Sequence, residues 1–147
     1  MVSSTLFKER NFGIAEGNKW TTERQLGLSD EEHWAKGIFP VPNGRKAKFP
    51  EGESLDDLRD RASQGIKEFI LPIVRDAVRE NEENVHVALV SHGAYISQVV
   101  PAMLALDYER RSKGLEVPNR RYTKLHNTAW TRVTIDLAVR HLCHHLK

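Results

Sequence analysis

The sequence predicts an α/β fold, in which helices pack on a mostly parallel β-sheet, and two observations support this prediction. Segments with strand character at 5–8, 85–91 and 129–137 alternate with segments of helical periodicity, an order that is typical of parallel sheets with helical crossovers. The second observation is the near-continuous apolar run at 87–90, since strands of parallel sheets are buried on both faces. The length of 147 residues suits one domain, so we expect a single domain over residues 1–147.

The chain opens with a short predicted strand that leads into a long polar excursion. Residues 5–8 are compatible with a strand, and Gly13 and Gly17 break the pattern after them. Residues 20–50 are polar and contain three prolines, so we expect a surface excursion with one short helix at 29–35. Such excursions often serve as lids over a binding site.

The clearest helix lies in the segment "GESLDDLRDRASQGIKEFILPIVRDAVREN", residues 52–81. Ser54 is placed to cap this helix together with Asp57, three residues further on. Apolar residues recur at helical spacing on one face: Leu55, Leu58, Ala62, Ile66, Phe69, Ile73 and Ala77. Pro72 falls inside the pattern, and we expect it to kink the helix.

The second half of the chain predicts a strand, a helix and a further strand. Residues 85–91, "VHVALVS", form the strand that we expect to be buried on both faces. A helix follows almost at once at 94–106, with Pro101 inside it. The segment "AWTRVTIDL", 129–137, alternates apolar and polar residues, which predicts a strand with one face toward water.

Composition and charge limit the classes of partner. The net charge of +2 is small and its basic excess sits in "NGRKAKF" and "ERRSKGLEVPNRRYTK", which favours small anionic ligands over nucleic acid. With Cys143 as the single cysteine, no internal disulfide forms, which fits a reducing compartment. No apolar stretch approaches the roughly 18 residues of a membrane span, and the start lacks a secretory pattern. We expect a cytoplasmic protein without a membrane partner.

Candidate site residues follow the first two predicted strands. Ligands of open α/β sheets bind at the carboxyl ends of the strands, and Glu9 and His92 both stand at such an end. Gly93 allows a backbone amide to approach a ligand closely, and Ala94 begins the following helix. The free N–H groups and the dipole at that helix start favour an anion, most naturally a phosphate.

Four ordered motifs carry a resemblance to a known family. "LFKERNFGIAEG" resembles the Glu-Arg-aromatic-Gly segment of the histidine phosphatase superfamily, the phosphoglycerate mutase-like proteins. "GESLDDLRDRA" resembles that family's Gly-Glu-Ser helix start, "VALVSHGAYI" its second catalytic histidine motif, and "LHNTAWTRVTID" the strand that follows. Within the superfamily the chain is most similar to the fructose-2,6-bisphosphatase-like branch. The resemblance covers about residues 6–137, and four motifs in order are far more specific than one.

The resemblance implies phosphoryl transfer through a phosphohistidine, without a metal or another cofactor. It implies that His92 donates to the phosphoryl oxygens and that Glu9 protonates the leaving oxygen. Arg61 matches the arginine of the family's Gly-Glu-Ser helix, and Arg10 is equally placed to bind phosphate or to pair with Glu9. We take both arginines, together with Gly93 and Ala94, as candidates for anion binding. Helical phase puts Arg59 nearer the apolar face, so periodicity and resemblance disagree on which arginine points inward, and we favour Arg61.

The chain departs from the family pattern at two places. It contains no Arg-His-Gly, the motif of the nucleophile, and His33, His86 and His126 lack the context to replace it. We interpret the chain as a truncated phosphoglycerate mutase-like fold that lacks two strands, whose absence leaves apolar edges for refolding or for a homo-oligomer to cover. The second departure is Ser97, where bisphosphatase-like relatives carry an arginine.

Two functions of different class therefore remain open. The first is a weakly active or inactive histidine phosphatase-like protein that binds a phosphorylated small metabolite or another anion. The alternative is a non-catalytic sugar-binding (lectin-like) or other binding protein that uses the fold as an oligomer.

Two further motifs are weaker. "LVSHG" approximates the nucleophile elbow of serine hydrolases, but Leu89 replaces its first glycine. The tail "HLCHHLK" has spacings that suit zinc, but a closed zinc site needs a defined set of four ligands, so we expect no metal.

Overall fold

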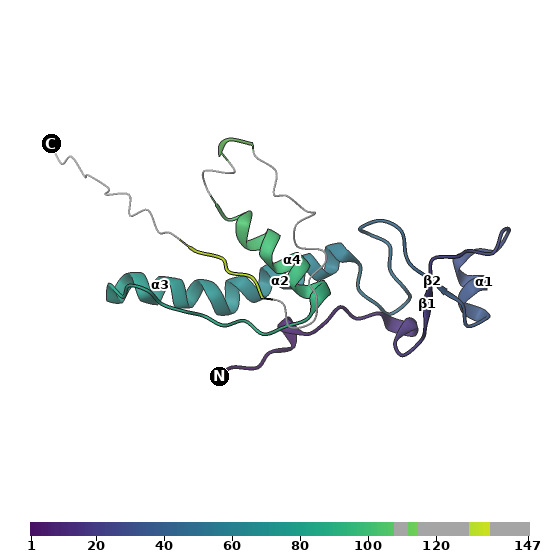
Figure 1. Cartoon of the computed structure of the whole chain (residues 1–147), viewed down its shortest axis with the longest axis horizontal. Helices are drawn as coiled ribbons and strands as arrows, with labels where there is room; N and C mark the ends of the chain where they lie inside the picture. The colour runs from purple at the N-terminus through teal and green to yellow at the C-terminus, as the bar shows by residue number, and fades with distance from the viewer. Residues whose placement is uncertain (108–111, 115–129, 136–147) are drawn as a thin grey trace.

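The computed structural model of the chain describes residues 1–107, 112–114 and 130–135. Figure 1 shows an elongated arrangement, with helices α2, α3 and α4 at one end and a small unit made of α1, β1 and β2 at the other. In chain order, the elements are the 3₁₀ turns Thr5–Phe7 and Gly13–Ala15, β1 (Trp20–Thr21), α1 (Asp30–Ala35), β2 (Phe39–Pro40), α2 (Leu55–Gly65), the π-helical turn Ile66–Ile70, α3 (Leu71–Glu80) and α4 (Gly93–Leu104).

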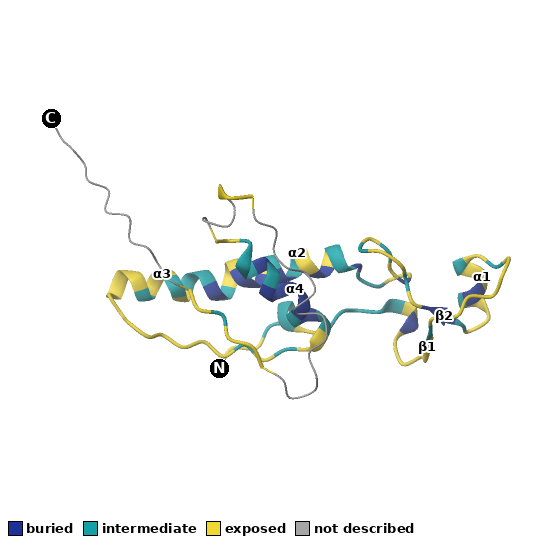
Figure 2. Ribbon diagram, turned by 45° about the horizontal axis from the view of Figure 1, so that its top comes forward, coloured by how far each residue is buried: buried dark blue, intermediate teal, exposed yellow. Residues whose placement is uncertain are grey.

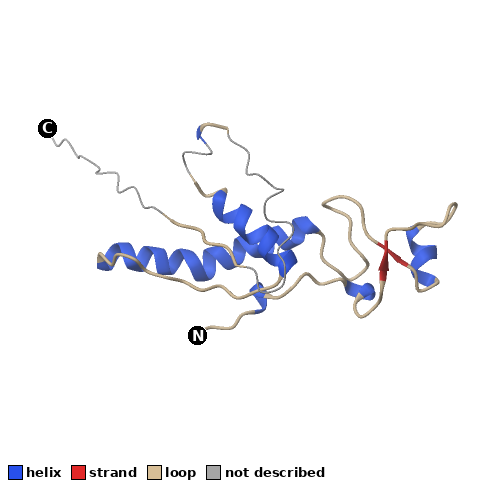
Figure 3. Cartoon of the chain, in the orientation of Figure 1, coloured by secondary structure: helices blue, strands red, loops and turns tan. Residues whose placement is uncertain are grey.

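The described sheet is small, with two strands that run parallel. Trp20 pairs with Phe39 and Thr21 with Pro40, so the fold mixes helices with a two-stranded parallel sheet, which is consistent with the α/β class (Figure 3). The larger sheet predicted from the sequence is absent among the described residues. Neither β1 nor β2 lies where the sequence predicted a strand.

The three segments expected as strands are not strands in the described part of the chain. The first forms the 3₁₀ turn Thr5–Phe7, and residues 85–91 and 130–135 have no regular secondary structure. Residues 129, 136 and 137 lie outside the described residues. A strand exists only where a neighbour takes up its backbone hydrogen bonds, and no described segment pairs with these two. The strand-like composition of residues 85–91 and 130–135 is therefore not enough to make them strands.

The predicted helices are present, and their caps explain where they begin. Ser29 and Ser54 each form a capping box: the serine oxygen accepts the N–H of the third helical residue, and that residue's carboxylate accepts the serine N–H. The N–H of Leu71 bonds back to the Ile66 carbonyl, which makes the π-helical turn directly before Pro72. We expected a kink at Pro72, but the structure has this π-helical turn instead, and α3 continues α2 in much the same direction (Figure 1).

The main core lies where α4 packs on α2 and on the π-helical turn. Figure 2 shows the buried residues concentrated there. These residues are Leu58, Ala62, Ile66, Ile70, Tyr95, Val99, Val100 and Ala102. Phe7 packs against this core, with its ring 6.0 Å from that of Tyr95. The apolar face predicted from helical periodicity thus contributes Leu58, Ala62 and Ile66 to the buried core, which leaves the opposite face of the helix for polar contacts.

The excursion and residues 12–15 share a second, aromatic cluster. Its buried residues are Ala15, Phe39 and Phe49, with Phe12 and Trp34 packed against them. Gly13 holds this cluster to residues 50–52, because it has a φ of +55° and a Cβ there would lie 1.9 Å from the Pro50 carbonyl oxygen. The excursion therefore packs together with residues 12–15 around a core separate from the main one, and its returning limb, at Arg45 and Ala47, contacts Gln98 and Arg10.

Among the described helices, none combines the length and the apolar character that crossing a membrane requires.

Candidate functional site

Two segments far apart in the sequence meet at the start of α4. The Ser91 hydroxyl donates to the Phe7 carbonyl over 2.6 Å, and the Ala94 N–H donates to Glu9 Oε2 over 3.3 Å. His92 is the N-cap residue of α4, so Glu9 and His92 are brought to the same helix terminus. The sequence predicts this meeting from strand ends, whereas in the structure hydrogen bonds from Ser91 and from the start of α4 to residues 7 and 9 produce it.

The Glu9 carboxylate lies where the helix start offers free backbone donors. Its Oε1 accepts the Arg10 N–H over 2.7 Å, while its Oε2 accepts the Ala94 N–H. The first N–H groups of a helix have no partner within the helix, and an anion at this end is favoured by the helix dipole. The side chain of Glu9 therefore holds a position that suits an external anion equally well.

The His92 imidazole takes no part in capping α4. Its backbone is extended and its carbonyl accepts the Ile96 N–H over 2.9 Å, but the side chain makes no capping hydrogen bond. The residue is exposed, and its ring nitrogens have no partner among the described residues. The next residue, Gly93, also faces open space, because a Cβ added there would meet nothing within 4 Å. Both residues are accessible to a ligand.

Arg10 is partly buried and partly available. Its Nε donates to the Glu53 carbonyl over 2.7 Å, its Nη2 donates to the Ala47 carbonyl over 3.3 Å, and its guanidinium lies over the Phe12 ring. Burial lowers the pKa of Arg10, while the nearby carboxylates act in the opposite sense. Its Nη1 has no hydrogen-bond partner within the described residues, and this group is free to donate to an anion.

Arg61 points inward from α2, whereas Arg59 is exposed. Its Nε and Nη2 form a two-pronged ion pair with the Glu53 carboxylate, over 2.7 and 2.8 Å. The rest of its donors go to the carbonyls of Leu6, Lys8 and Glu9. Helical phase pointed to Arg59 as the inward arginine and was wrong, because the long side chain of Arg61, beside the buried face, reaches sideways to polar partners.

Glu53 is a central residue that the sequence analysis did not single out. Besides Arg61, its carboxylate accepts the Asn11 N–H over 2.9 Å. Burial by itself raises the pKa of Glu53, but the hydrogen bonds from Arg61 and Asn11 outweigh it, so the pKa lies below its usual value. The sequence signal that could have identified Glu53 is a carboxylate directly before the capping serine, in a chain with arginines at 10 and 61.

Ser97, where an arginine was expected, is buried and does not supply a charge. Its hydroxyl donates to the Ala94 carbonyl over 2.6 Å, one turn back along α4. The neighbouring Gln98 accepts from Arg45 Nη2 over 2.9 Å. This part of α4 is therefore occupied by contacts with the returning limb of the excursion.

The other histidines lie away from this helix terminus or outside the described residues. His33 is buried, with Nδ1 2.6 Å from the Ser29 carbonyl and Nε2 accepting the Gln25 N–H, so both ring nitrogens are committed to its own segment. His86 lines a separate cavity. His126 and the tail residues His141, Cys143, His144 and His145 lie outside the described residues. Within the described residues no group of three acidic, histidine or cysteine side chains is arranged to hold a metal.

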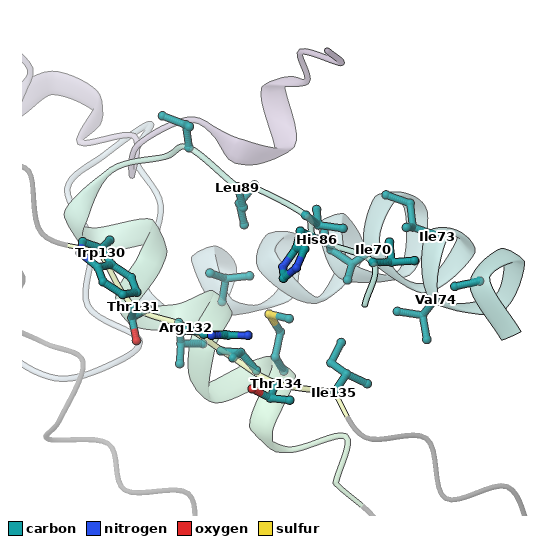
Figure 4. Close-up of a pocket in the computed structure, with 18 of the residues that line it drawn as sticks. Ile70, Ile73, Val74, His86, Leu89, Trp130, Thr131, Arg132, Thr134 and Ile135 are labelled. Atoms are coloured by element: carbon teal, nitrogen blue, oxygen red, sulfur yellow. The ribbon is translucent and has the colours of Figure 1, made fainter. Parts of the chain in front are cut away.

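That cavity is a second feature, with a volume of about 840 Å³. It lies between one side of α3 and α4 and the irregular segments 84–91 and 130–135 (Figure 4). Its lining is largely apolar, and two of the lining residues, Val90 and Trp130, are 89% and 83% exposed. Neither irregular segment forms a backbone hydrogen bond with another described segment. The cavity reaches Ser91 but is not lined by Glu9, Arg10 or His92.

Comparison with known proteins identifies the family. The model of the histidine phosphatase superfamily (branch 1) matches residues 1–140. The match spans nearly the whole chain and confirms the resemblance found in the four motifs. Searches of curated proteins and of solved structures found no match.

Proposed function

Because the chain belongs to the histidine phosphatase superfamily, we propose that it binds a phosphorylated small metabolite or a related anion at the start of α4. The proposed anion site consists of Glu9, Arg10, His92 and the N–H groups of Gly93 and Ala94. These 147 residues contain no Arg-His-Gly, so we propose that by themselves they turn such a ligand over weakly or not at all.

The position of the Glu9 carboxylate carries this proposal. A negatively charged group already accepts the Ala94 N–H at the helix terminus, and the next residue in the chain, Arg10, has a free Nη1 among the described residues. An accessible imidazole at His92 adds a donor of the kind that stabilises phosphoryl oxygens. The Ala94 N–H, Arg10 Nη1 and the His92 imidazole thus offer hydrogen-bond donors and positive charge from two segments of the chain, which is what binding of a phosphate requires.

Glu9 has two roles in the proposed site. As a carboxylate it competes with an external anion for the Ala94 N–H. When protonated it loses its negative charge, releases that N–H and becomes a proton donor for a leaving oxygen. The same residue therefore limits anion binding and supplies the acid of any residual phosphatase reaction.

Binding of inorganic phosphate to the full chain tests the proposal, with calorimetry as the measurement. We expect saturable binding that weakens about tenfold in His92→Ala, which loses one charge-assisted hydrogen bond. Glu9→Gln should bind about fivefold more tightly, because it removes a like charge a few ångströms from the ligand. Absence of saturable binding in the wild-type chain would refute the proposal.

Turnover is measured separately with 4-nitrophenyl phosphate and by a search for an acid-labile phosphoprotein. We expect neither to exceed a trace. Substantial turnover that disappears in His92→Ala would instead establish an active phosphatase. Binding on a sugar array without binding of phosphate would favour the lectin-like alternative.

A second candidate function is self-association through the cavity, and the unpaired segments around it favour this. Residues 84–91 and 130–135 present apolar side chains and backbone groups that lack a sheet neighbour in the described structure. Such edges pair readily with another edge of the same kind. We propose that a second copy of the chain covers this cavity, since an isologous contact places equivalent edges together.

Sedimentation velocity of the full chain at several concentrations tests self-association. We expect a dimer or larger species that Val90→Lys converts to monomer, because a charge on an exposed edge opposes pairing. Leu26→Lys is the matched control, since Leu26 is 104% exposed on the excursion and should leave the association unchanged. A monomer at every concentration would exclude this second candidate.

A further inference from the structure

We infer that Arg61 is a positioning residue, which holds Glu9 at the start of α4 with Glu53 as its counter-ion, and that it is not a ligand of the anion. This inference rests on the proposed function, because it assigns Arg61 a role in the proposed anion site. It differs from the role that the family resemblance suggested for this arginine.

Every donor of the Arg61 guanidinium is already used. A guanidinium has five N–H groups. Two of those in Arg61 go to the Glu53 carboxylate and the other three go to the carbonyls of Leu6, Lys8 and Glu9, at distances between 2.7 and 3.1 Å. To bind an anion, Arg61 would have to leave at least one of these acceptors without its donor.

Burial and charge oppose such an exchange. The side chains of Arg61 and Glu53 are 12% and 19% exposed, so a group left without a partner there is costly. The Glu53 carboxylate lies directly against the guanidinium and repels a second anion at the same place. An external phosphate is therefore better served by Arg10, whose Nη1 is free among the described residues.

The three carbonyls that Arg61 binds all belong to the segment that carries Glu9. This segment has no sheet neighbour in the described structure, and Arg61 supplies donors where an adjacent strand would otherwise do so. With the Glu9 backbone fixed in this way, its side chain reaches the Ala94 N–H on α4. Arg61 thus acts on the proposed anion site through the peptide that joins Glu9 to Arg10, and so through both side chains.

Glu53→Gln separates the two roles by the direction of its effect. If Arg61 is a positioning residue, loss of the counter-ion loosens the peptide between Glu9 and Arg10 and displaces Arg10, the arginine of the proposed anion site. The affinity for inorganic phosphate then falls by about tenfold, because the loss of a charge-assisted hydrogen bond from Arg10 outweighs the release of the Ala94 N–H by Glu9. If Arg61 were an anion ligand, the same change would free it and remove a repelling charge, so phosphate would bind more tightly. Tighter binding would overturn the inference.

Arg61→Lys gives a second test of the same idea. A lysine keeps the positive charge but cannot serve five acceptors in a planar fork. We expect this variant to lose as much affinity as Glu53→Gln, and the double variant to lose no more than either single one, because both changes break one unit. Affinity close to wild type in Arg61→Lys would contradict positioning by the fork.

Asp56→Asn is the matched control. It breaks the Arg45–Asp56 pair at the start of the same helix, whose Nε to Oδ1 distance is 2.8 Å. We expect a change in stability there without a change in phosphate affinity. An equal loss of affinity in this control would show that general loosening of α2, rather than the clamp on Glu9, weakens binding.

The Ala94 amide resonance in NMR spectra without phosphate provides a readout that a general loss of stability does not move. Spectra are recorded well below the unfolding midpoint of each variant. We expect this amide to shift in Glu53→Gln and Arg61→Lys as the Glu9 contact weakens, and to stay in place in Asp56→Asn. If wild type binds no phosphate, the proposed function fails, while an unmoved Ala94 amide in both clamp variants refutes positioning itself.

Discussion

Residues 6–10 and residues 85–91 both run beside the main helices without a sheet neighbour in the described structure, yet they are held very differently. The first segment is anchored by the Arg61 guanidinium, which binds three of its carbonyls. The second is joined to the described structure by the Ser91 hydroxyl and by side-chain packing around the cavity. Arg61 therefore supplies the hydrogen bonds of an absent strand to residues 6–10, whereas residues 85–91 receive no such hydrogen bonds from the described structure.

Arg61→Ala should break the anchored segment and have the largest effect. It leaves the mostly buried Glu53 carboxylate unpaired and three carbonyls without their donor. Removing one partner of a buried ion pair typically costs about 3 to 5 kcal/mol of unfolding free energy. Urea denaturation measures this loss. Arg59→Ala, at an exposed position of the same helix, should change stability by less than about 0.5 kcal/mol.

Gly65→Ala should disturb the same segment through packing. A Cβ at this position would lie 2.9 Å from Phe7 Cε1 and 2.9 Å from the Tyr95 hydroxyl oxygen. Overfilling a packed core usually costs about 1 to 3 kcal/mol. Thermal unfolding measures the cost, and Gly93→Ala, where a Cβ meets nothing within 4 Å, is the control. Equal effects at the two glycines would show that this packing is not decisive.

Ser91→Ala tests the link between the two segments. The change removes the 2.6 Å hydrogen bond to the Phe7 carbonyl, and we expect a loss of about 1 kcal/mol in unfolding free energy. Hydrogen exchange should rise in both segments, because this bond is a direct tie between them. Faster exchange in residues 85–91 alone would show that Arg61 is a sufficient anchor for residues 6–10.

Acid should weaken the anchored segment in a defined direction. The pKa of Glu53 lies below its usual value of 4.5 in the folded chain, because hydrogen bonds from Arg61 and Asn11 outweigh the effect of burial. Its contribution to stability is therefore complete above about pH 4.5 and is lost as the pH falls through the lowered pKa. Unfolding midpoints between about pH 6 and pH 2 measure it. Parallel curves for wild type and Glu53→Gln would contradict this assignment.

Val90→Ser should have the smallest effect of all. Val90 is 89% exposed on the open segment, so its replacement should change the stability of the isolated chain by less than about 0.5 kcal/mol. Denaturation at low protein concentration measures this value. A clear loss of stability that grows with protein concentration would indicate that a second copy covers Val90.

Helices were predictable from the sequence, and strands were not. The capping serines at 29 and 54 and the apolar spacing of α2 involve residues within a few positions of one another, and both caps are found in the structure. The run at 85–91 has the composition of a buried strand but no paired neighbour in the described structure. Strand formation depends on a partner segment, and local composition does not supply one.

The proposed anion site shows the same division. Glu9 and His92 were predicted to converge, and the structure places the Glu9 carboxylate at the start of α4, where His92 is the N-cap residue. Glu53 was missed, because its importance depends on contacts with Arg61 and with the N–H of Asn11, 42 positions away. Whether the convergent residues bind an anion stays a prediction until phosphate binding is measured.

The amino-acid sequence by itself determined the helices, their caps and membership of the histidine phosphatase superfamily, because these depend on interactions or motifs within short stretches of chain. Only the tertiary structure decided that Arg61 serves the backbone of residues 6–9 across 52 to 55 positions. It also decided that the apolar side of α3 and α4 faces a cavity. The physical reason is that backbone groups and charges outside helices take whichever distant partners the fold brings to them.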